Sequence, residues 1–472
     1  MNTQGHNPEL IHQLNDKPPL PQAFFSAFQH MLASFVGVVT PTLVIGGVLG
    51  LGEHIPYLIS MALIASGIGT FIQARRFRSL GSGLLSIQGT SFAFLSSLIA
   101  AGFVVKSRGG SNEEIIALMT GLCFFGAFIE IILSRFFHKL RKIITPTVTG
   151  IVISLIGLSL IKVAVTDIAG GFKAPDFGAM SNLAVGIIVL ATVIFFNRST
   201  RPMIRLSAIF LGLIVGALIT LYTGKMTLHG LSDSALFTLP VPFKYGMAFD
   251  WELFIPVALI YVITTIESTG DLTATTMLSG EPIEGDEYVE RIRGGILADG
   301  VNSLTAACLN SFPTTTFSQN NGVIQMTGVA SRFVGYIIAG LFVVMGLFPV
   351  IGAILMQIPK PVLGGATLVM FGTVAASGIR ILASEQLDRR QVMIIAVSIG
   401  LGLGVTIVPD VLSQMPALVK NIFGSSITTG GLTAILLTLF LPEDSGLESS
   451  HQRKVVKNIT VSSDSIKEET AS

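Results

Sequence analysis

The chain has 472 residues, of which only 12% are charged and 50% are hydrophobic, and its formal net charge is +1. A typical soluble domain is about 25% charged, so this composition excludes a soluble globular enzyme and a disordered chain. The chain has no excess of basic residues to neutralise phosphate groups, which excludes a nucleic-acid binder. Apolar residues recur in blocks of about 15–25, the length that a helix needs to cross about 30 Å of hydrocarbon. The sequence therefore predicts an all-α polytopic membrane protein.

Fourteen of these blocks are predicted to be transmembrane segments. In chain order they cover residues 24–45, 55–74, 84–104, 115–137, 147–165, 182–196, 204–223, 252–275, 294–309, 317–330, 332–353, 362–383, 390–407 and 426–441. The third and the tenth are short or interrupted. An even number of segments places both termini on one side of the membrane.

The distribution of lysine and arginine indicates which side this is. If the N-terminus is inside, the inner loops carry 16 of these residues and the outer loops carry 8. Cytoplasmic loops are the ones enriched in Lys and Arg, so we expect both termini to be cytoplasmic. Residues 1–22 are polar and contain prolines, which predicts that no cleavable signal peptide opens the chain.

Two sequence patterns recur in the two halves of the chain. Residues 146–150 (PTVTG) and 361–365 (PVLGG) open the fifth and the twelfth segments, and residues 83–91 (GLLSIQGTS) correspond to 312–320 (FPTTTFSQN). Both pairs are seven segments apart, and an odd number of segments gives the halves opposite topology. Paired broken helices in an inverted repeat indicate a binding site at the midplane. Similar composition of membrane helices rich in Gly and Pro is the alternative explanation.

Two acidic residues lie within the eighth segment. Glu267 and Asp271 are four residues apart and so share one face of a helix. A carboxylate in the middle of a membrane costs several kcal/mol unless it faces a polar cavity or a partner. Both are therefore candidates for a functional site, and the structural alternative is that they cap a broken helix or bond a neighbouring one.

Four further polar residues lie in apolar segments. Asp299, between glycines in the ninth segment, is either a member of a proton relay or a partner of a neighbouring hydroxyl. His30 in the first segment is either a structural histidine or a ligand contact. Glu130 and Lys162 lie nearer to segment ends, where we expect their charged groups to reach the interface.

The densest polar stretch is residues 311–322 (SFPTTTFSQNNG). It predicts an extended approach interrupted by proline, followed by the start of a new helix near Ser318 or Gln319. A helix start offers free backbone N–H groups to a ligand, and the amides, hydroxyls and phenylalanines here suit a planar hydrogen-bonding ligand. A re-entrant loop with a purely structural role is the alternative.

Residues 319–328 (QNNGVIQMTG) resemble the signature of the nucleobase–ascorbate transporter family, in which Asn and Gly follow a Gln, Glu or Pro, and Thr comes five residues after that Gly. The resemblance extends from about residue 9 to 442 and includes residues 82–88, Glu267 and residues 298–300. The bacterial xanthine permeases are the most similar branch.

The resemblance implies two inverted repeats of seven segments, with short antiparallel strands in segments 3 and 10 that meet at the midplane. It implies a core domain (segments 1–4 and 8–11) and a gate domain (segments 5–7 and 12–14). We therefore expect a cytoplasmic N-terminal tail (1–22), core parts at 23–140 and 246–358, gate parts at 141–245 and 359–442, and a flexible cytoplasmic tail (443–472). Homodimerisation and an elevator-like movement of core against gate are also implied.

The polar pattern and the resemblance together predict the site residues. The expected substrate-binding residues are Glu267, Gln319, Ser91, Phe92, Phe317 and Ser318. Those expected in proton coupling or a core network are Asp299, Asp271, His30 and Asn320, and those expected to affect selectivity or helix packing are Thr327 and Gly328. By resemblance, Glu267 and Gln319 bind two polar edges of the base. Asn320 supports this site, and backbone near Ser91 and Phe92 closes it.

The implied function is a proton-coupled purine permease that imports xanthine across the bacterial inner membrane, with the proton as coupling ion and no cofactor or metal. In this family Gln at the first signature position is found with purines, Glu with uracil and Pro with ascorbate. Ser91 stands where some xanthine permeases have Asn, which leaves room for the additional oxo group of urate. A urate, broader purine or uracil carrier is therefore the alternative.

The sequence supports two other classes of membrane protein less well. An anion transporter of this architecture would need a cationic residue near the start of the tenth segment, where the sequence has Gln319, Asn320 and Asn321. A membrane-embedded enzyme would need a nucleophile–base pair or a metal cluster, and the sequence has no His, Cys and Asp spacing of that kind. We therefore expect a transporter.

Overall fold

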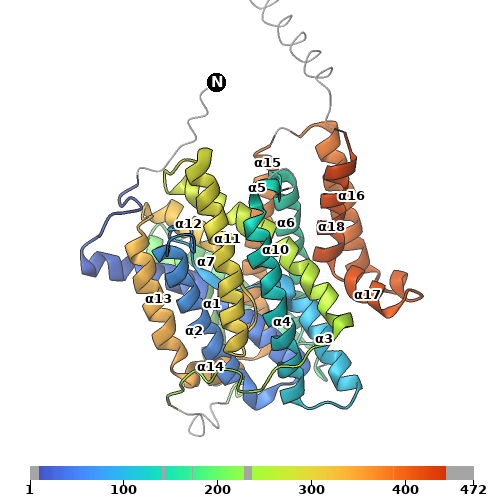
Figure 1. Cartoon of the computed structure of the whole chain (residues 1–472). Coiled ribbons are helices and arrows are strands. Elements are labelled where there is room, and N and C mark those ends of the chain that lie inside the picture. Colours follow the sequence, from blue (N-terminus) through green and yellow to red (C-terminus); the bar gives the residue numbers. More distant parts are fainter. Residues whose placement is uncertain (1–9, 141–143, 173, 228–235, 386, 443–472) are drawn as a thin grey trace, which may run out of the picture.

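A computed structural model describes residues 10–140, 144–172, 174–227, 236–385 and 387–442 of the chain, and these form a bundle of helices (Figure 1). The predicted tail 443–472 and the first nine residues of the chain lie outside the described residues. In Figure 1 the chain leaves α18 at the top, the side on which the N-terminal segment also lies. The two ends of the described chain are therefore on one side, as an even number of segments requires.

The first half of the chain forms α1 (Leu20–Leu49), α2 (Ile55–Arg75), β1 (Gln88–Thr90), α3 (Leu95–Ser107), α4 (Asn112–Arg135), α5 (Phe137–Leu140), α6 (Pro146–Ile168), α7 (Met180–Asn197), α8 (Pro202–Leu206) and α9 (Ala208–Tyr222). The second half forms α10 (Trp251–Leu278), α11 (Gly285–Cys308), β2 (Thr314–Thr316), α12 (Gln319–Thr327), α13 (Arg332–Gly346), α14 (Pro349–Gln357), α15 (Lys360–Ala383), α16 (Arg389–Ile407), α17 (Ala417–Phe423) and α18 (Ser426–Phe440).

The predicted segments correspond to these helices. Within the described residues, 8 helices are long and apolar enough to cross a membrane. Two bent pairs, α13 with α14 (74°) and α17 with α18 (81°), pass the same test together, and α9 and the stretch Phe92–Ser107 are shorter apolar helices. The remaining predicted segments are α11 and α12, whose charged or polar residues lower their hydropathy. The chain is therefore a multi-pass membrane protein.

One predicted boundary is wrong. The ninth segment was expected at 294–309, but α11 begins at Gly285. Its first turns carry Asp286, Glu287, Glu290 and Arg291, so hydropathy alone cannot detect them although they continue the same helix. The charged turns lie outside the apolar part of the helix, at the end nearest the loop that follows α2.

Several helix starts follow directly from the local sequence. α4 begins at a capping box, in which Ser111 accepts from the backbone N–H of Glu114 and the Glu114 side chain accepts from the N–H of Ser111. Asp388 and Gln391 form the same arrangement at the start of α16. At α10 the Asp250 carboxylate caps the first backbone N–H groups. These caps satisfy donors that a helix start otherwise leaves unpaired.

β1 and β2 are antiparallel, with Gln88 opposite Thr316 and Thr90 opposite Thr314. Each strand lies in the equivalent broken segment of its half, and a helix follows each one. The short antiparallel strands predicted in segments 3 and 10 are therefore confirmed. Gly89 is required here, because a Cβ on it would lie 2.2 Å from the ring of Phe317.

The helices pack in two groups. α1 to α4 contact one another and α10 to α14, while α6, α7 and α9 contact α15, and α16 packs on α18. Glycines of the two repeat motifs lie in the close pair α6–α15: Gly150 lies against the backbone of Gly378, and Gly364 lies against the backbone of Ile168. The two groups meet where α10 packs on α6 and α18, and where α1 packs on α8 and α9.

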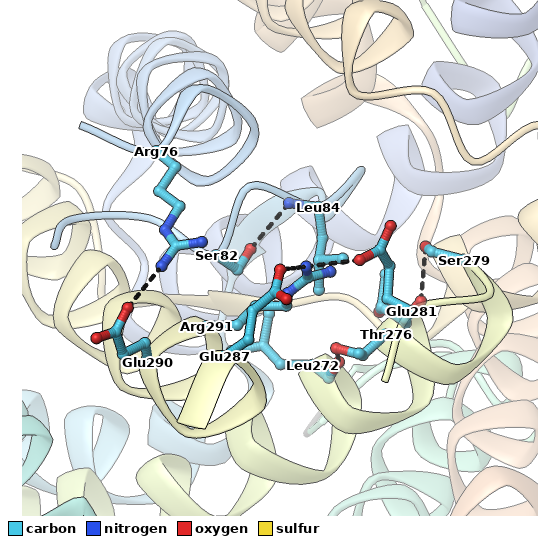
Figure 2. A network of polar contacts seen from close by, with 11 residues as sticks. Arg76, Ser82, Leu84, Leu272, Thr276, Ser279, Glu281, Glu287, Glu290 and Arg291 are labelled. Atoms are coloured by element: carbon cyan, nitrogen blue, oxygen red, sulfur yellow. Dashed lines mark hydrogen bonds and ion pairs between the residues drawn. The ribbon is translucent and has the colours of Figure 1, made fainter. Parts of the chain in front are cut away.

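A network of ion pairs joins α11 to its surroundings at the end that carries its charged turns (Figure 2). The buried Arg291 donates to Glu281 at 2.8 Å and to Glu287 at 3.0 Å. Arg76, in the loop after α2, pairs with Glu290 at 3.4 Å. The network therefore attaches two loops to one helix.

Candidate functional site

Asp299 is the centre of a buried polar network. Its Oδ1 accepts from Nε2 of Gln73 and of Gln88, each at 2.7 Å. Its Oδ2 accepts from Ser268 Oγ, which is 3.1 Å from the hydroxyl of Thr315. One carboxylate therefore joins α2, β1, α10, α11 and β2. Asp299 was predicted to be in such a network, but Gln73, Gln88 and Ser268 were missed. Gln73 and Ser268 have no sequence signal beyond being polar residues in apolar segments, whereas Gln88 ends the stretch 82–88 of the family resemblance and was given no role.

His30 and Asn320 form a second buried pair. Asn320 Nδ2 donates to the carbonyl of Leu85, which orients its amide so that Oδ1 faces His30 Nδ1 at 2.8 Å. Because this amide oxygen only accepts, Nδ1 of the histidine is the donor in this arrangement. His30 Nε2 is buried without a partner. The pair connects α1, the start of α12 and the segment before β1.

Asp271 and Asn321 connect α10 to the start of α12. The hydroxyl of Thr316 donates to Asp271 Oδ2 at 3.4 Å. Asn321 Oδ1 accepts from the hydroxyl of Thr275 at 2.6 Å. Asp271 is therefore held by the strand β2, and the polar residues that follow Gln319 are part of the packing between helices.

Glu267 lies one turn before Asp271 on α10, as the four-residue spacing predicts. Its Oε2 is buried and has no hydrogen-bond partner. The carboxyl group is close enough to Asp271 and Asp299 to interact electrostatically with both. A buried acceptor without a donor costs about 1–3 kcal/mol. Glu267 Oε2 is thus an acceptor that is available to a ligand.

Gln319 and Ser318 line a cavity of about 470 Å³. The start of α12 forms one wall, and α8, α9 and α15 form the other, so the cavity lies between the two groups of helices. Two cationic side chains, Arg205 and Arg380, also line it. Neither arginine was predicted for the site, because both are far from Gln319 in the chain. A second cavity of about 440 Å³ lies between α10 and the pair α6–α15, and Thr269 and Thr273 line it.

The predicted aromatic residues lie in different places. The Phe92 ring contacts Phe371 of α15 edge-on, with centroids 5.3 Å apart. Phe317 is buried, and its ring fills the space above Gly37 and Gly89. In this structure Phe92 thus lies between the two helix groups, while Phe317 packs behind β1.

Ser91 caps the short 3₁₀ turn after β1. Its Oγ accepts from the N–H of Ala93 at 3.3 Å, and its own N–H donates to the carbonyl of Pro313 at 2.8 Å. The Ser91 amide, which we expected to close the site around a ligand, is therefore used in pairing with the β2 segment. Its hydroxyl remains a possible donor.

Thr327 and Gly328 end α12. The Thr327 hydroxyl donates to the carbonyl of Val323 at 2.8 Å, and Gly328 adopts φ 67° at the C-cap. The Gly328 carbonyl accepts from the N–H groups of Ile11 and His12. Of the two predicted roles, selectivity or helix packing, the observed contacts are those of packing.

The expectation for Glu130 was wrong. It was expected to reach the interface, but the residue is only 1% exposed and its Oε1 has no partner. α4 continues to Arg135, and Gly126 and Ala127, on the same face, pack against α10 and α11. That face is therefore internal, and Glu130 interacts electrostatically with Asp299 and Glu267. Lys162 does lie at the surface, where it contacts the carbonyl of Thr406 at 3.4 Å.

The described part of the chain contains no group of three or more His, Cys, Asp or Glu residues that could hold a metal ion. The site is thus a set of carboxyls, amides and hydroxyls around the two strands and the start of α12. Such groups bind a polar organic molecule by hydrogen bonds.

Comparisons with known proteins find similarity to permeases over most of the chain. The model of a family described as a permease family matches residues 21–411. The xanthine permease XanP of Escherichia coli (strain K12) is 45% identical over 446 residues, which are 93% of this chain and 96% of XanP. The xanthine permease XanQ of the same strain is 48% identical over 438 residues, 92% and 94% of the two chains. The nucleobase transporter PlUacP of Paenibacillus larvae is 36% identical over 413 residues, 87% and 92% of the two chains.

Solved structures share the fold at low sequence identity. The transmembrane domain of the cyanobacterial bicarbonate transporter BicA has a TM-score of 0.52 at 14% identity, over 90% of this chain and 99% of that domain. The murine anion transporter Slc26a9, in an inward-facing state, has a TM-score of 0.59 at 12% identity, over 90% of this chain and 69% of that one. At such identities the likeness shows the arrangement of helices alone.

Proposed function

The chain belongs to this permease family, the nucleobase–ascorbate transporters, and from this premise we propose that it is a proton-coupled permease that imports xanthine. It is a transporter rather than an enzyme, as the sequence predicted. The single observation that carries the substrate is the 45–48% identity to two xanthine permeases over more than nine-tenths of the chain. The proposal includes no cofactor other than the coupling proton.

The unpartnered Glu267 Oε2 and the Gln319 side chain support a binding site between α10 and the start of α12. Glu267 would accept hydrogen bonds from N–H groups of the base. The Gln319 amide offers both a donor and an acceptor, and so suits the mixed edge of a purine better than a carboxylate does. Asn320, held by His30, would keep the start of α12 in position.

We propose that the coupling proton is held within the acid group Glu267, Asp271 and Asp299. The Gln73 and Gln88 amides and the Ser268 hydroxyl that donate to Asp299 are all neutral, so its protonation can change without breaking an ion pair. Because Ser268 is adjacent to Glu267 on α10, binding of a base at Glu267 is coupled to this network through one residue.

Transport would follow an elevator-type movement. The core domain (23–140 and 246–358) would slide against the gate domain (141–245 and 359–442), carrying the site with it. Two cavities of about 440 and 470 Å³ separate the helix groups at one side of the bundle, which supports a sliding surface there. A homodimer in the bacterial inner membrane with both termini cytoplasmic completes the proposal.

A urate carrier is the second candidate. Arg205 and Arg380 in the cavity beside Gln319 would attract a substrate that carries a negative charge at neutral pH, and the small Ser91 leaves room for an additional oxo group. Ser91→Asn should therefore reduce competition by urate more than uptake of xanthine. Loss of uptake of every purine in this variant would contradict the selectivity argument.

The test is uptake of labelled xanthine in a bacterial host that lacks its own purine permeases, with and without a protonophore. Unlabelled urate, hypoxanthine and uracil serve as competitors. Glu267→Gln should abolish uptake at unchanged expression, whereas Glu252→Gln, an exposed acid on the same helix, should not. Well-expressed protein that carries urate or uracil but no xanthine would overturn the substrate, and uptake insensitive to the protonophore would overturn the coupling.

A further inference from the structure

A third cavity lies outside the site, at the end of α2 and the start of α13. Its volume is about 390 Å³, and the residues that line it are Asn15, Asp16, Lys17, Arg75, Arg332, Phe333 and Tyr336. Three separate parts of the chain supply its cations: the segment before α1, the last residue of α2 and the first residue of α13.

The cavity has an excess of positive charge. Among the described residues, the ion pairs involve Arg76, Arg108 and Arg291 and none of the three cations of this cavity. Asp16 is the one carboxylate among the lining residues, and its Oδ2 accepts from the backbone N–H of Gln13 at 2.8 Å. Two arginines and a lysine thus face a single acid, an arrangement that favours an anion such as a phosphate group.

Aromatic side chains continue from the cavity onto the outer surface of the bundle. Tyr336 contacts Phe71 with ring centroids 5.5 Å apart, and Phe71 contacts Phe77 at 6.0 Å. Phe71 and Phe77 are 41% and 47% exposed. Tyrosine is enriched where a membrane protein meets the lipid headgroups, and the exposed phenylalanine rings beside Tyr336 are an apolar surface that suits acyl chains. A free phosphate would use the cations alone, whereas a phospholipid would use both the cations and this aromatic surface.

We propose that this cavity binds the headgroup phosphate of an anionic phospholipid, with Lys17, Arg75 and Arg332 as its ligands. The acyl chains would lie along the aromatic surface of α2 and α13. Basic pockets between helices at the cytoplasmic side are a known mode of lipid recognition, and α2 ends on the side that we expect to be cytoplasmic.

A lipid bound in this cavity would also stabilise the neighbouring connection between α12 and α13. The segment before α1 is hydrogen-bonded to the connection between α12 and α13. The Ala330 N–H donates to the His12 carbonyl at 2.9 Å, and the Arg332 N–H donates to the Leu14 carbonyl at 3.0 Å. Leu14 is buried. A lipid that holds Lys17 and Arg332 together would therefore stabilise the segment that follows the signature residues.

The experiment measures the thermal stability and the native mass spectrum of the purified full chain in detergent. The probes are phosphatidylglycerol, phosphatidylcholine and inorganic phosphate. Phosphatidylglycerol should bind and raise the melting temperature, and the other two should do so much less. The triple variant Lys17→Gln/Arg75→Gln/Arg332→Gln should weaken phosphatidylglycerol binding by about tenfold or more.

Matched variants separate this site from general surface charge. Arg135→Gln/Arg293→Gln/Arg389→Gln removes the same number of cations from exposed positions outside the cavity and should bind phosphatidylglycerol like the parent. Equal binding by both triple variants would overturn the site. Equal stabilisation by phosphate and lipid would overturn the lipid as its ligand. If the triple variant fails to fold, Lys17→Gln, at an exposed position outside any helix, provides the same comparison.

Discussion

Asp299 and Arg291 lie on the same helix, α11, eight residues apart, and each is the centre of a polar network. Around Asp299 the partners are the amides of Gln73 and Gln88 and the hydroxyl of Ser268. Around Arg291 the partners are the carboxylates of Glu281 and Glu287 (Figure 2). One network joins neutral groups to an acid, and the other joins opposite charges.

This difference separates a group that can change its charge from one that cannot. Arginine stays protonated in proteins, so the Arg291 network is a permanent attachment of the loop after α10 to α11. Asp299 can gain or lose a proton while amides and a hydroxyl rotate or stay in place. Within one helix, the network near the strands suits a change of protonation state and the network at the charged end suits structural support.

The largest expected effect is that of Asp299→Ala. It removes the acceptor of the Gln88 amide, and it removes one of two partners from Gln73 and from Ser268, which keep the Gly295 carbonyl and the Thr315 hydroxyl. A buried donor left unpaired costs about 1–3 kcal/mol, and the deleted carboxyl also leaves a cavity in a packed core. We therefore expect a large loss of melting temperature and of folded yield. Asp299→Asn keeps the size and one acceptor oxygen, so it should fold within about 1 kcal/mol of the parent while uptake loses its protonophore sensitivity. Equal melting temperatures for the Ala and Asn variants would show that the network does not hold the core together.

Arg291→Ala should have a smaller effect, on stability alone. Hydrogen bonds to charged groups contribute about 1.5–3 kcal/mol, and Glu281 and Glu287 remain partly accessible to water once the arginine is removed. The melting temperature should fall, while xanthine uptake per folded molecule and its pH dependence stay as in the parent. The control is Arg293→Ala, two residues along the same helix and exposed. A changed pH profile in Arg291→Ala would place this network in the transport cycle.

A substitution of Glu130 tests whether other acids share protons with the network around Asp299. Glu130→Gln removes an ionisable group that interacts with Asp299 and Glu267 and keeps the size of the side chain, so stability should change by less than about 1 kcal/mol. If protons are shared among these acids, the pH at which uptake is half-maximal should move. Uptake should be measured over a range of external pH, beside the exposed Glu113→Gln on the same helix. Identical profiles for the two variants and the parent would exclude Glu130 from the shared set.

The smallest effect concerns Asp250, an acid at the membrane surface. Burial alone would raise the pKa of Asp250, but the Arg108 guanidinium at 3.0 Å and the N–H groups of Glu252 and Leu253 hold it below its ordinary value. A carboxyl with a lowered folded pKa stabilises the fold above its ordinary pKa of about 4 and loses this contribution as the pH falls through the folded value.

Asp250→Asn should therefore lower the melting temperature slightly at neutral pH. As the pH falls from roughly 5 to 3, the melting temperature of this variant should decrease less than that of the parent. Asp410→Asn, at another exposed position, is the control. A parent and an Asp250→Asn variant that lose stability in parallel over this range would show that the Arg108–Asp250 pair contributes nothing.

Hydropathy and local motifs were enough to predict the class of protein, the positions of most segments and the two interrupted ones. Blocks of about 15–25 apolar residues have few alternatives in a membrane, and the polar stretch 311–322 places β2 and the start of α12 directly. Glu267 and Asp271 were found because any carboxylate in an apolar segment is conspicuous. These features depend on residues close together in the chain.

The tertiary structure alone decided which of these residues meet. Gln73 reaches Asp299 across 226 positions of sequence, and Arg205 and Arg380 join Gln319 in one cavity although none of them is near another in the chain. Glu130 faces inward because the small residues on its face of α4 pack against α10 and α11. Hydropathy shows that a stretch is apolar, but it does not show which neighbour each face of the helix meets. Composition along the chain determined which segments enter the membrane, and close packing at particular glycines decided the partners of their polar side chains.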